Sequence, residues 1–236
     1  MHFLLLGHGK TGALVAEVAR ERGHNLKVLR SAENVHAAGL TPAALQGIDV
    51  VIDFTTPQAA LENMRACLRH GKKMVVGTTG WYSSLSEIKQ LAANNGGFVY
   101  ASNFSIGVNI FFELACTASA ALQAGYSGRI LERHHSQKKD APSGTALTIR
   151  SLLQPNLQQH PEEKLEITSV REGDTVGQHV ILLDSLDDTI MLVHDAKSRR
   201  GYAEGAVRAA EWIATRQGFY EFREVLPHLK PAASHK

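Results

Sequence analysis

The first hundred residues alternate between short, mostly apolar runs and longer stretches in which apolar residues recur every three or four positions. The longer stretches predict helices at Gly12–Arg22, Pro57–Arg69 and Ser84–Ala93. The short runs are typical of strands buried on both faces of a parallel sheet, and they lie at Phe3–Leu6, Leu26–Leu29, Ile48–Ile52, Met74–Val76 and Phe98–Tyr100. Strands that alternate with helices predict right-handed βαβ units and a doubly wound α/β sheet of the Rossmann type.

The pattern changes after about residue 104. Helices predicted at Val108–Gln123 and Gly144–Leu153 accompany closely spaced strands, which predicts an α+β domain with a mixed or antiparallel sheet; the strands are expected at Arg129–His135, Leu165–Val170, His179–Asp184 and Thr189–His194. We therefore expect a dinucleotide-binding domain over residues 1–104 and a second domain over residues 105–200. A last helix near Tyr202–Gln217 should return the chain to the first domain within residues 201–236, and Pro231–Lys236 should be a frayed tail.

Composition narrows the classes of function. With 44% hydrophobic and 20% charged residues, the chain of 236 residues has the make-up of a globular protein, not of a disordered chain or a coiled coil. A formal net charge of +2 lies far from the basic excess that nucleic-acid binding requires. Cys67 and Cys116 lack the spacing of a disulfide framework or a zinc site, so neither is predicted. Because the sequence shows neither a signal peptide nor an apolar run of about 18 residues, a cytoplasmic protein without membrane spans is expected.

A glycine-rich loop follows the first predicted strand. The residues Gly7, His8, Gly9, Lys10, Thr11 and Gly12 fit the pattern GxGxxG between a strand and a helix, which is the context of the dinucleotide fingerprint. Glycines let the backbone approach a pyrophosphate, whose charge is met by free N–H groups and the helix dipole. A P-loop is excluded, because it requires a glycine where Leu4 stands. A glycine-rich turn without a ligand remains the alternative.

The end of the second predicted strand bears on cofactor choice. Sites that prefer NAD place an acidic residue there to bind the ribose diol, whereas this chain has Arg30 and Ser31. A guanidinium and a hydroxyl suit a 2′-phosphate better, and Lys10 could add a second positive charge. NADPH is therefore the predicted cofactor, with NADH as a possible substitute. The alternative is that Arg30 is an ordinary surface arginine.

The segment from Glu132 to Thr145 contains the highest concentration of residues suited to catalysis or ligand binding. Its adjacent histidines His134 and His135 point to opposite faces of a regular strand, so both can serve one site only if the strand ends there. The following turn leads into a helix, whose free N–H groups form a site for an anion such as a substrate carboxylate. The sequence signal for a metal site is weaker, because the pair of histidines lacks a third ligand at a suitable spacing. A solvated basic loop with a helix cap stays open as the alternative.

The run from His134 to Ala146 resembles the signature of the 4-hydroxy-tetrahydrodipicolinate reductase family, also called dihydrodipicolinate reductase. Other motifs occur in the family's order along almost the whole chain. They are Asp53-Phe54-Thr55, Gly77-Thr78-Thr79-Gly80, the run from Ala101 to Asn109, the run from Arg171 to Gly177, Ser198-Arg199 and Gly205-Ala206-Val207. The glycine loop alone would be a weak signal, but these motifs together are specific.

The resemblance implies an enzyme of lysine and diaminopimelate biosynthesis. It uses NADPH or NADH to reduce a cyclic dicarboxylate and is usually a homotetramer built through the second domain. By the resemblance, His134 is the acid/base and Lys138 the proton donor, and substrate is bound by His135, Ser143, Gly144 and Thr145. Beyond the glycine loop, Arg30 and Ser31, the resemblance places cofactor-binding residues at Phe54, Gly77, Thr78, Thr79, Ala101, Ser102, Asn103 and Phe104.

Departures from the family pattern leave alternatives open. Leu6 stands where the family's GxxGRMG loop has its first glycine, Lys10 and Thr11 replace its Arg-Met pair, and Arg30 replaces an acidic residue. These substitutions leave the cofactor preference open. The chain is also shorter than is usual in the family, which leaves the oligomeric state open. A non-catalytic NAD(P)-binding sensor and a related two-domain amino-acid dehydrogenase are the alternative functions.

Overall fold

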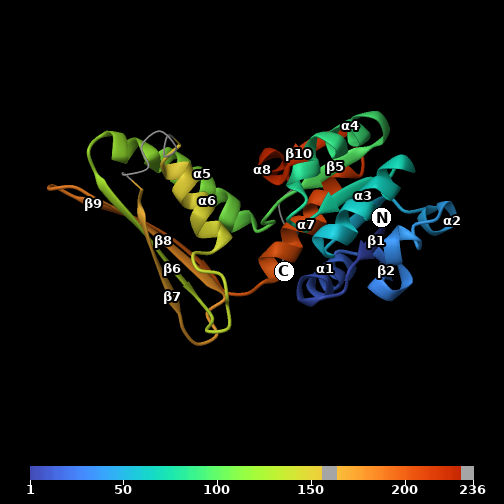
Figure 1. The fold of residues 1–236 in the computed structure, drawn as a ribbon, viewed down its shortest axis with the longest axis horizontal. Coiled ribbons are helices and arrows are strands. Elements are labelled where there is room, and N and C mark those ends of the chain that lie inside the picture. Colours follow the sequence, from blue (N-terminus) through green and yellow to red (C-terminus); the bar gives the residue numbers. More distant parts are fainter. Residues whose placement is uncertain (156–163, 230–236) are drawn as a thin grey trace. The chain divides into compact units, whose positions relative to one another are not determined.

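The computed structural model describes residues 1–155 and 164–229 (Figure 1). Within it the chain forms two compact units. Residues 1–106 and 200–229 make the first unit, and residues 107–199 make the second. The predicted tail at Pro231–Lys236 lies outside the described residues.

The first unit is built on a six-stranded sheet in which every pair of neighbours is parallel. The strand order is β10-β5-β4-β3-β1-β2, with β1 at His2–Leu6, β2 at Asn25–Leu29, β3 at Val50–Asp53, β4 at Lys73–Val76, β5 at Gly97–Tyr100 and β10 at Gly218–Glu221. The chain runs outward from β1 in both directions, to β2 on one side and to β3 on the other. This reversal creates a switch point between β1 and β3, as expected for a doubly wound sheet.

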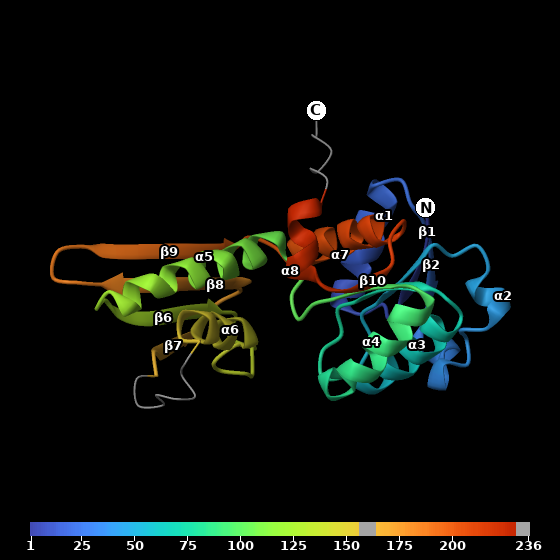
Figure 2. The same ribbon diagram turned by 90° about the horizontal axis from the view of Figure 1, so that it is seen from above.

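Helices cover both faces of this sheet (Figure 2). Helices α1 (Lys10–Glu21) and α7 (Arg200–Ile213) pack on the face that includes Phe3 and Val75. Helices α3 (Pro57–Arg69) and α4 (Leu85–Asn95) pack on the opposite face. Because both faces are covered, the strands are apolar at successive positions, and this is why the short runs predicted them correctly.

Several short elements were not predicted. These are β10, the helices α2 (Pro42–Leu45) and α8 (Phe222–Val225), and four 3-10 turns at residues 31–33, 35–37, 82–84 and 226–228. Helix α7 ends at Ile213, whereas the sequence predicted a helix to Gln217. The chain instead turns into β10, where the Phe219 ring stacks on that of Phe98 at 5.1 Å. A strand of three half-buried residues and one exposed residue has too little periodicity to be recognised in the sequence.

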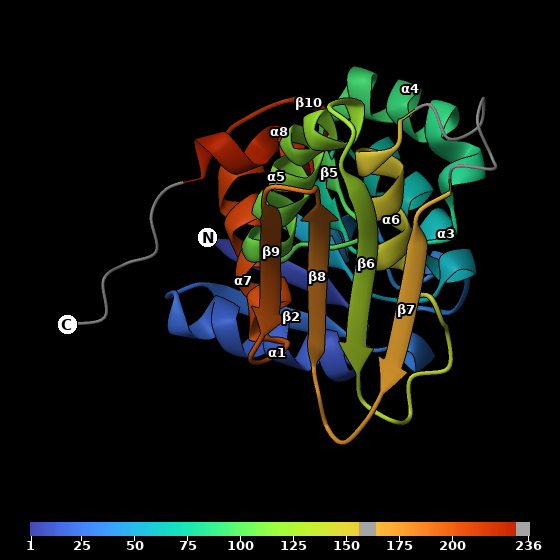
Figure 3. The same cartoon turned by 90° about the vertical axis from the view of Figure 1, so that its left-hand side faces the viewer.

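The second unit is a four-stranded mixed sheet with helices on one face (Figure 3). Its order is β7-β6-β8-β9, with β6 at Ser127–His134, β7 at Glu166–Arg171, β8 at Gly177–Asp184 and β9 at Thr189–Ala196. Strands β6 and β7 are parallel and the other pairs antiparallel. Helices α5 (Ile106–Gln123) and α6 (Gly144–Leu153) pack on the sheet through apolar side chains such as Phe111 and Ile149. The mixed sheet confirms the prediction for this half.

Helix α5 is long and apolar enough to cross a membrane by length and composition alone, with a mean hydropathy of 1.3 over 18 residues. The sequence predicted no membrane span, because it contains no continuous apolar run of about 18 residues. Within the second unit, Val108, Phe111 and Ala115 of this helix are buried in the core. Length and composition are weak grounds for a span, since the core helix of a globular domain passes the same test.

Candidate active site

The residues predicted to bind the cofactor come together at one edge of the first sheet. In a parallel sheet the carboxyl ends of all strands lie at the same edge, and loops leaving those ends line the crevice at the switch point. The pairings Leu6 with Leu29 and Leu6 with Asp53 bring the ends of β1, β2 and β3 level. The segments that directly follow β1 to β5, including the first turn of α1, contain these residues. In order they are Gly7 to Gly12, Arg30 and Ser31, Phe54, Gly77 to Thr79, and Ala101 to Phe104.

The glycine loop has the backbone that close approach to a phosphate requires. Gly7 has φ +86°, and a Cβ there would lie 2.4 Å from the Phe54 carbonyl oxygen. A Cβ on Gly12 would lie 2.3 Å from the Gly7 carbonyl oxygen, so neither position admits a side chain. Gly9 is the N-cap of α1 and has no described atom within 4 Å of a Cβ, which leaves the first N–H groups of the helix open to a ligand. These residues fit a bound dinucleotide.

Two exposed cations lie beside this loop. Arg30 follows β2 directly, and the Gly7 N–H donates to the Leu29 carbonyl oxygen at 3.4 Å, so the two loops are neighbours. Lys10 opens α1 three residues after Gly7. Ser31 begins a 3-10 turn after Arg30. The side chains of all three predicted phosphate-binding residues therefore stand at exposed positions near one strand end.

The other predicted cofactor residues form a layer around an aromatic ring. Phe54 packs so tightly over Gly77 that a Cβ at Gly77 would lie 2.2 Å from the ring. Its ring centroid lies 6.2 Å from that of buried Phe104. Thr79 and Ser102 are exposed at the ends of their loops, which leaves their hydroxyls accessible to a ligand.

A buried carboxylate that the sequence did not single out ties two of these loops together. Asp53 accepts hydrogen bonds from the Thr55 N–H and hydroxyl at 2.9 and 2.7 Å, from the Thr78 hydroxyl at 3.0 Å and from the Asn63 amide at 2.8 Å. Burial raises the pKa of Asp53, and the hydrogen bonds from Thr55, Asn63 and Thr78 only partly oppose it. The signal that could have found it is a charged residue ending a strand that is otherwise fully apolar.

The residues around His134 lie at one end of the second sheet, which we call its His134 edge. Strand β6 ends at His134, β7 ends at Arg171, and the antiparallel β8 begins there at Gly177. His135 follows the last residue of β6, so the strand ends where the sequence analysis required it to end. The loop that follows contains Lys138, whose ammonium donates to both oxygens of Asp140 at 2.8 Å. This hydrogen bond from Lys138 lowers the pKa of Asp140.

The His135 ring contacts an arginine from the far end of the second unit's sequence. The Arg199 guanidinium lies 3.2 Å from Nε2 of His135. Arginine has only donors, so in this contact the guanidinium donates and Nε2 of His135 accepts. Arg199 was quoted only as part of a motif, and its approach to His135 depends on a contact 64 positions away in the chain.

Helix α6 begins in the same loop cluster. Ser143 is its N-cap, and its hydroxyl accepts from the Ala146 N–H at 3.2 Å. The Ser143 N–H donates to both oxygens of Glu132, so its polar groups are engaged within the protein. The N–H groups of Gly144 and Thr145 have no partner in residues 1–155 and 164–229, and no described atom lies within 4 Å of a Cβ at Gly144. Open N–H groups at a helix N-terminus are the arrangement that an anion site requires.

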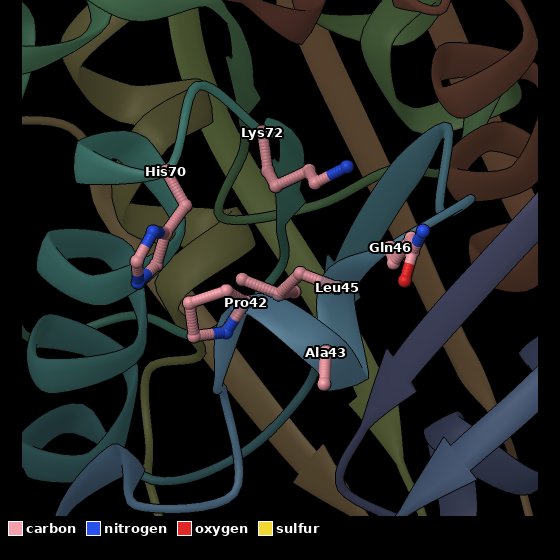
Figure 4. A pocket seen from close by; sticks show the side chains of 6 residues that line it. All are labelled: Pro42, Ala43, Leu45, Gln46, His70 and Lys72. Carbon is pink, nitrogen blue, oxygen red and sulfur yellow. The ribbon is translucent and has the colours of Figure 1, made fainter.

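The cavity in Figure 4 lies at the other edge of the first sheet. It has a volume of about 470 Å³ and is lined by residues that precede β3 and β4, including Gln46 and Lys72. The Lys72 ammonium donates to the Ile48 carbonyl oxygen at 3.0 Å. Since dinucleotides bind at the carboxyl edge of such sheets, this cavity is separate from the candidate cofactor site.

Comparison with known proteins decides the family. The family model described as dihydrodipicolinate reductase, N-terminus, matches residues 1–104, and the one described as dihydrodipicolinate reductase, C-terminus, matches residues 107–226. The chain belongs to the dihydrodipicolinate reductase family. A curated 4-hydroxy-tetrahydrodipicolinate reductase from Christiangramia forsetii is 37% identical over 97% of this chain and 99% of its own length. Another from Chromobacterium violaceum is 42% identical over 78% of this chain and 75% of its own.

The fold is shared with solved structures. A dipicolinate-bound dihydrodipicolinate reductase from Paenisporosarcina sp. TG-14 matches with a TM-score of 0.77 at 24% identity, covering 95% of this chain and 99% of that one. A probable dehydrogenase from Thermotoga maritima matches with a TM-score of 0.60 at 10% identity, covering 96% of this chain and 93% of that one. The predicted resemblance and fold class are confirmed. The roles of individual residues stay predictions.

Proposed function

We propose that the chain reduces 4-hydroxy-tetrahydrodipicolinate to tetrahydrodipicolinate, with NADPH as the preferred hydride donor and His134 and Lys138 as the proton-transfer residues. As a member of the family, it is an NAD(P)H-dependent oxidoreductase of lysine and diaminopimelate biosynthesis, as the resemblance predicted. The residue assignment is supported by the groups that come together at the His134 edge of the second sheet. This edge combines an ammonium, two histidines and the open N–H groups of Gly144 and Thr145 in one loop cluster.

Each of these residues has a chemical task in the proposal. A bound nicotinamide dinucleotide supplies the hydride. Overall the reaction consumes one hydride and one proton, and the 4-hydroxyl group leaves as water, which gives a conjugated, electron-poor ring. Hydride addition to that ring leaves an enamine-like species that needs a proton, and Lys138 or His134 supplies it as a general acid. The two substrate carboxylates need positive or N–H-rich surroundings, which the α6 N-terminus and His135 provide.

A coupled assay that generates the cyclic substrate in situ tests the proposal, with NADPH oxidation followed by absorbance. Steady turnover with that substrate, and none with open-chain amino acids, is the expected result. Binding of NADPH without turnover would instead support the sensor. Turnover of an open-chain amino acid would support the two-domain dehydrogenase.

The α6 N-terminus should determine the KM for the dicarboxylate. Gly144→Pro removes one N–H donor at a helix position that tolerates proline, next to extended Ser143 with ψ 155°. Thr145→Val removes a neighbouring hydroxyl. A carboxylate that loses such a donor in a desolvated site costs about 1 kcal/mol or more, so substrate KM should rise about fivefold or more while cofactor KM stays constant. Gly144→Ala keeps the N–H and is the control. A rise in cofactor KM alone would show that the turn binds the other ligand.

The chain should prefer NADPH over NADH modestly. Arg30 and Lys10 can bind a 2′-phosphate, but both are exposed, so salt and water weaken each contact. We expect kcat/KM to favour NADPH at low salt and the preference to shrink at high salt. The double variant Lys10→Ala with Arg30→Ala should lose it, whereas Lys27→Ala, another exposed lysine on β2, should keep it. Equal values for both cofactors in the wild type at low salt would contradict the assignment.

A homotetramer assembled through the second unit is part of the proposal. The face of its sheet away from α5 and α6 presents apolar side chains in register, with Val180 between Leu131 and Val193 and with Leu182 opposite Met191. Met191 is 60% and Val193 53% exposed. An apolar sheet face of this kind marks an interaction surface. Light scattering should give four times the mass of one chain, and a monomer at working concentrations would rule the assembly out. A cytoplasmic location, tested by cell fractionation, also stays a prediction.

A further inference from the structure

A row of polar side chains crosses the second sheet on the face that α5 and α6 cover. Glu132 of β6 pairs with Ser169 of β7 on one side and with His179 of β8 on the other. His179 in turn pairs with His194 of β9. Glu132 is 0% and His179 4% exposed, and the next inward residue of β6 after Glu132 is His134. The buried carboxylate of Glu132 is therefore the inward neighbour of His134, the proposed acid/base, on the same strand.

Glu132 is ionised in this position. Its carboxylate accepts from the Ser143 N–H at 3.0 and 3.1 Å, from the Ser169 hydroxyl at 2.7 Å and from the Arg171 guanidinium at 2.7 Å. Burial alone would raise the pKa of Glu132, but these hydrogen bonds outweigh it and lower the pKa to about 2. The oxygen Oε1 receives both the Arg171 and the Ser169 bond. Oε2 is the oxygen that faces the histidines.

The two ring nitrogens of His134 have different surroundings. Its Nδ1 is buried, has no hydrogen-bond partner of good geometry within the described residues, and lies 3.4 Å from Oε2 of Glu132. The other side of the ring borders Gly177, where a Cβ would lie 3.1 Å from Nε2. The side chain is 10% exposed, and since Nδ1 is enclosed, the accessible part lies on the far side of the ring.

We propose that Glu132 is a positioning residue for His134, accepting its Nδ1–H so that Nε2 is the nitrogen presented to substrate. Such a carboxylate fixes both the tautomer and the orientation of an imidazole, and it stabilises the imidazolium that forms during proton transfer. Hydrogen bonds of this kind are often long in the absence of substrate and shorten when it binds. The inference rests on the proposed function for its catalytic meaning, but not for the orientation itself.

The charges around His134 agree with this role. Burial lowers the pKa of His134, the Glu132 charge opposes that effect, and Lys138 and Arg171 lower the pKa further while Asp140 raises it. His179 meets the His134 ring edge-on at 5.2 Å. Burial and the nearby His134 lower the pKa of His179 to about 4, so His179 is neutral beside it at pH 7. Glu132 is therefore the buried anion that keeps His134 able to hold a proton.

The same three side chains have the separations of a metal site, because one ligand atom from each of Glu132, His134 and His179 lies within 4.8 Å of the others. Two histidines and a glutamate are a known ligand set for zinc. However, the Arg171 guanidinium already donates to this carboxylate at 2.7 Å, and a fixed positive charge there disfavours a cation. We therefore take the positioning role as the inference and metal binding as an outcome that would overturn it.

The test uses Glu132→Gln in the full-length protein. We expect kcat to fall about 10–100-fold, as for a small misplacement of a catalytic group, with substrate KM changed less. The basic limb of the kcat profile should move to lower pH, because the anion that raises the His134 pKa is gone. Glu172→Gln is the matched control, since it removes an exposed carboxylate, 3.1 Å from the Arg133 guanidinium, just after β7. It should leave kcat and the profile unchanged.

Glu132→Gln also leaves Arg171 as an unpaired charge, so a loss of activity could come from instability alone. The double variant Glu132→Gln with Arg171→Gln removes both charges and separates the two causes. We expect it to recover melting temperature but not kcat or the pH profile. Recovery of wild-type kcat in the double variant would show that Glu132 only neutralises Arg171, and would overturn the proposal.

A readout without substrate keeps this test independent of the reaction. Nitrogen-15 correlation spectra of the histidine rings report the tautomer and pKa of His134 directly. Wild type should carry the neutral-form proton on Nδ1, and Glu132→Gln should lower the His134 pKa and lose that preference. A wild-type ring protonated on Nε2, or activity that chelators remove and zinc restores, would overturn the proposal. If the spectra agree but the reductase assay fails, the fault lies in the proposed function and not in the orientation of His134.

Discussion

Alanine in place of His134 or Lys138 should lower kcat about 10²–10⁴-fold, the usual worth of general acid–base catalysis. Both residues lie at the His134 edge of the second sheet, close in sequence to the start of α6, and neither belongs to the glycine loop. The KM for NADPH should therefore change little in either variant, while kcat and kcat/KM for the dicarboxylate fall together. Steady-state kinetics with the coupled assay measure all three quantities.

Lys139→Ala is the matched control for this experiment. Lys139 is exposed and adjacent to Lys138, so its loss removes the same charge from the same loop. It should keep kcat near the wild-type value. Lys138 forms an ion pair with Asp140, whose side chain is 59% exposed. Because exposed ion pairs add little stability, Lys138→Ala should barely alter the melting temperature. Wild-type kcat in either His134→Ala or Lys138→Ala would remove that residue from the mechanism.

Gly205→Ala should destabilise the first unit by about 3 kcal/mol, the upper end of typical overpacking costs. Helix α7 lies against the end of β5 so closely that a Cβ on Gly205 would fall 1.7 Å from the Phe104 carbonyl oxygen. Because that atom belongs to the backbone, no side-chain rotation relieves the overlap, and the helix or the loop must move. Urea denaturation followed by circular dichroism measures the loss.

Gly201→Ala makes the same chemical change in the same helix. The nearest atom to a Cβ at Gly201 is the Ser105 hydroxyl oxygen at 3.6 Å, an ordinary contact. Since alanine is the better helix former by up to about 1 kcal/mol, this variant should be as stable as wild type or more so. If both variants lost equal stability, the cause would be flexibility needed throughout α7 and not the close approach at Gly205.

The sequence predicted the large elements of the fold because they bury whole faces. The strand at Phe3–Leu6 and the helix at Pro57–Arg69 were recognisable since their apolar residues follow a strand or helix period over the whole element. Strand β10 was missed, because its four residues gain their place from Phe98 and the end of α7, which are distant in the chain. Its pairing is a tertiary effect and leaves no local pattern.

The candidate site could likewise be predicted only in part from the sequence. The glycine loop and the segment around His134 could be found from contiguous motifs. Glu132 was present in the same segment, but its importance depends on Arg171 and His179, which reach it from other strands. Asp53 likewise depends on Asn63 and Thr78. A charged residue at an inward strand position is the one local signal, and it does not reveal its partners.

The first unit is interrupted along the chain by the whole of the second. Since synthesis runs from the N-terminus, residues 107–199 leave the ribosome before α7 and β10 have been made, so the inserted unit can finish folding while its host cannot. Until residues 200–221 emerge, β5 has an unpaired edge, and the apolar face that includes Phe3 and Val75 is covered by α1 but lacks α7. A nascent chain stalled at this stage would be a substrate for chaperones through its first half, although that half was translated first.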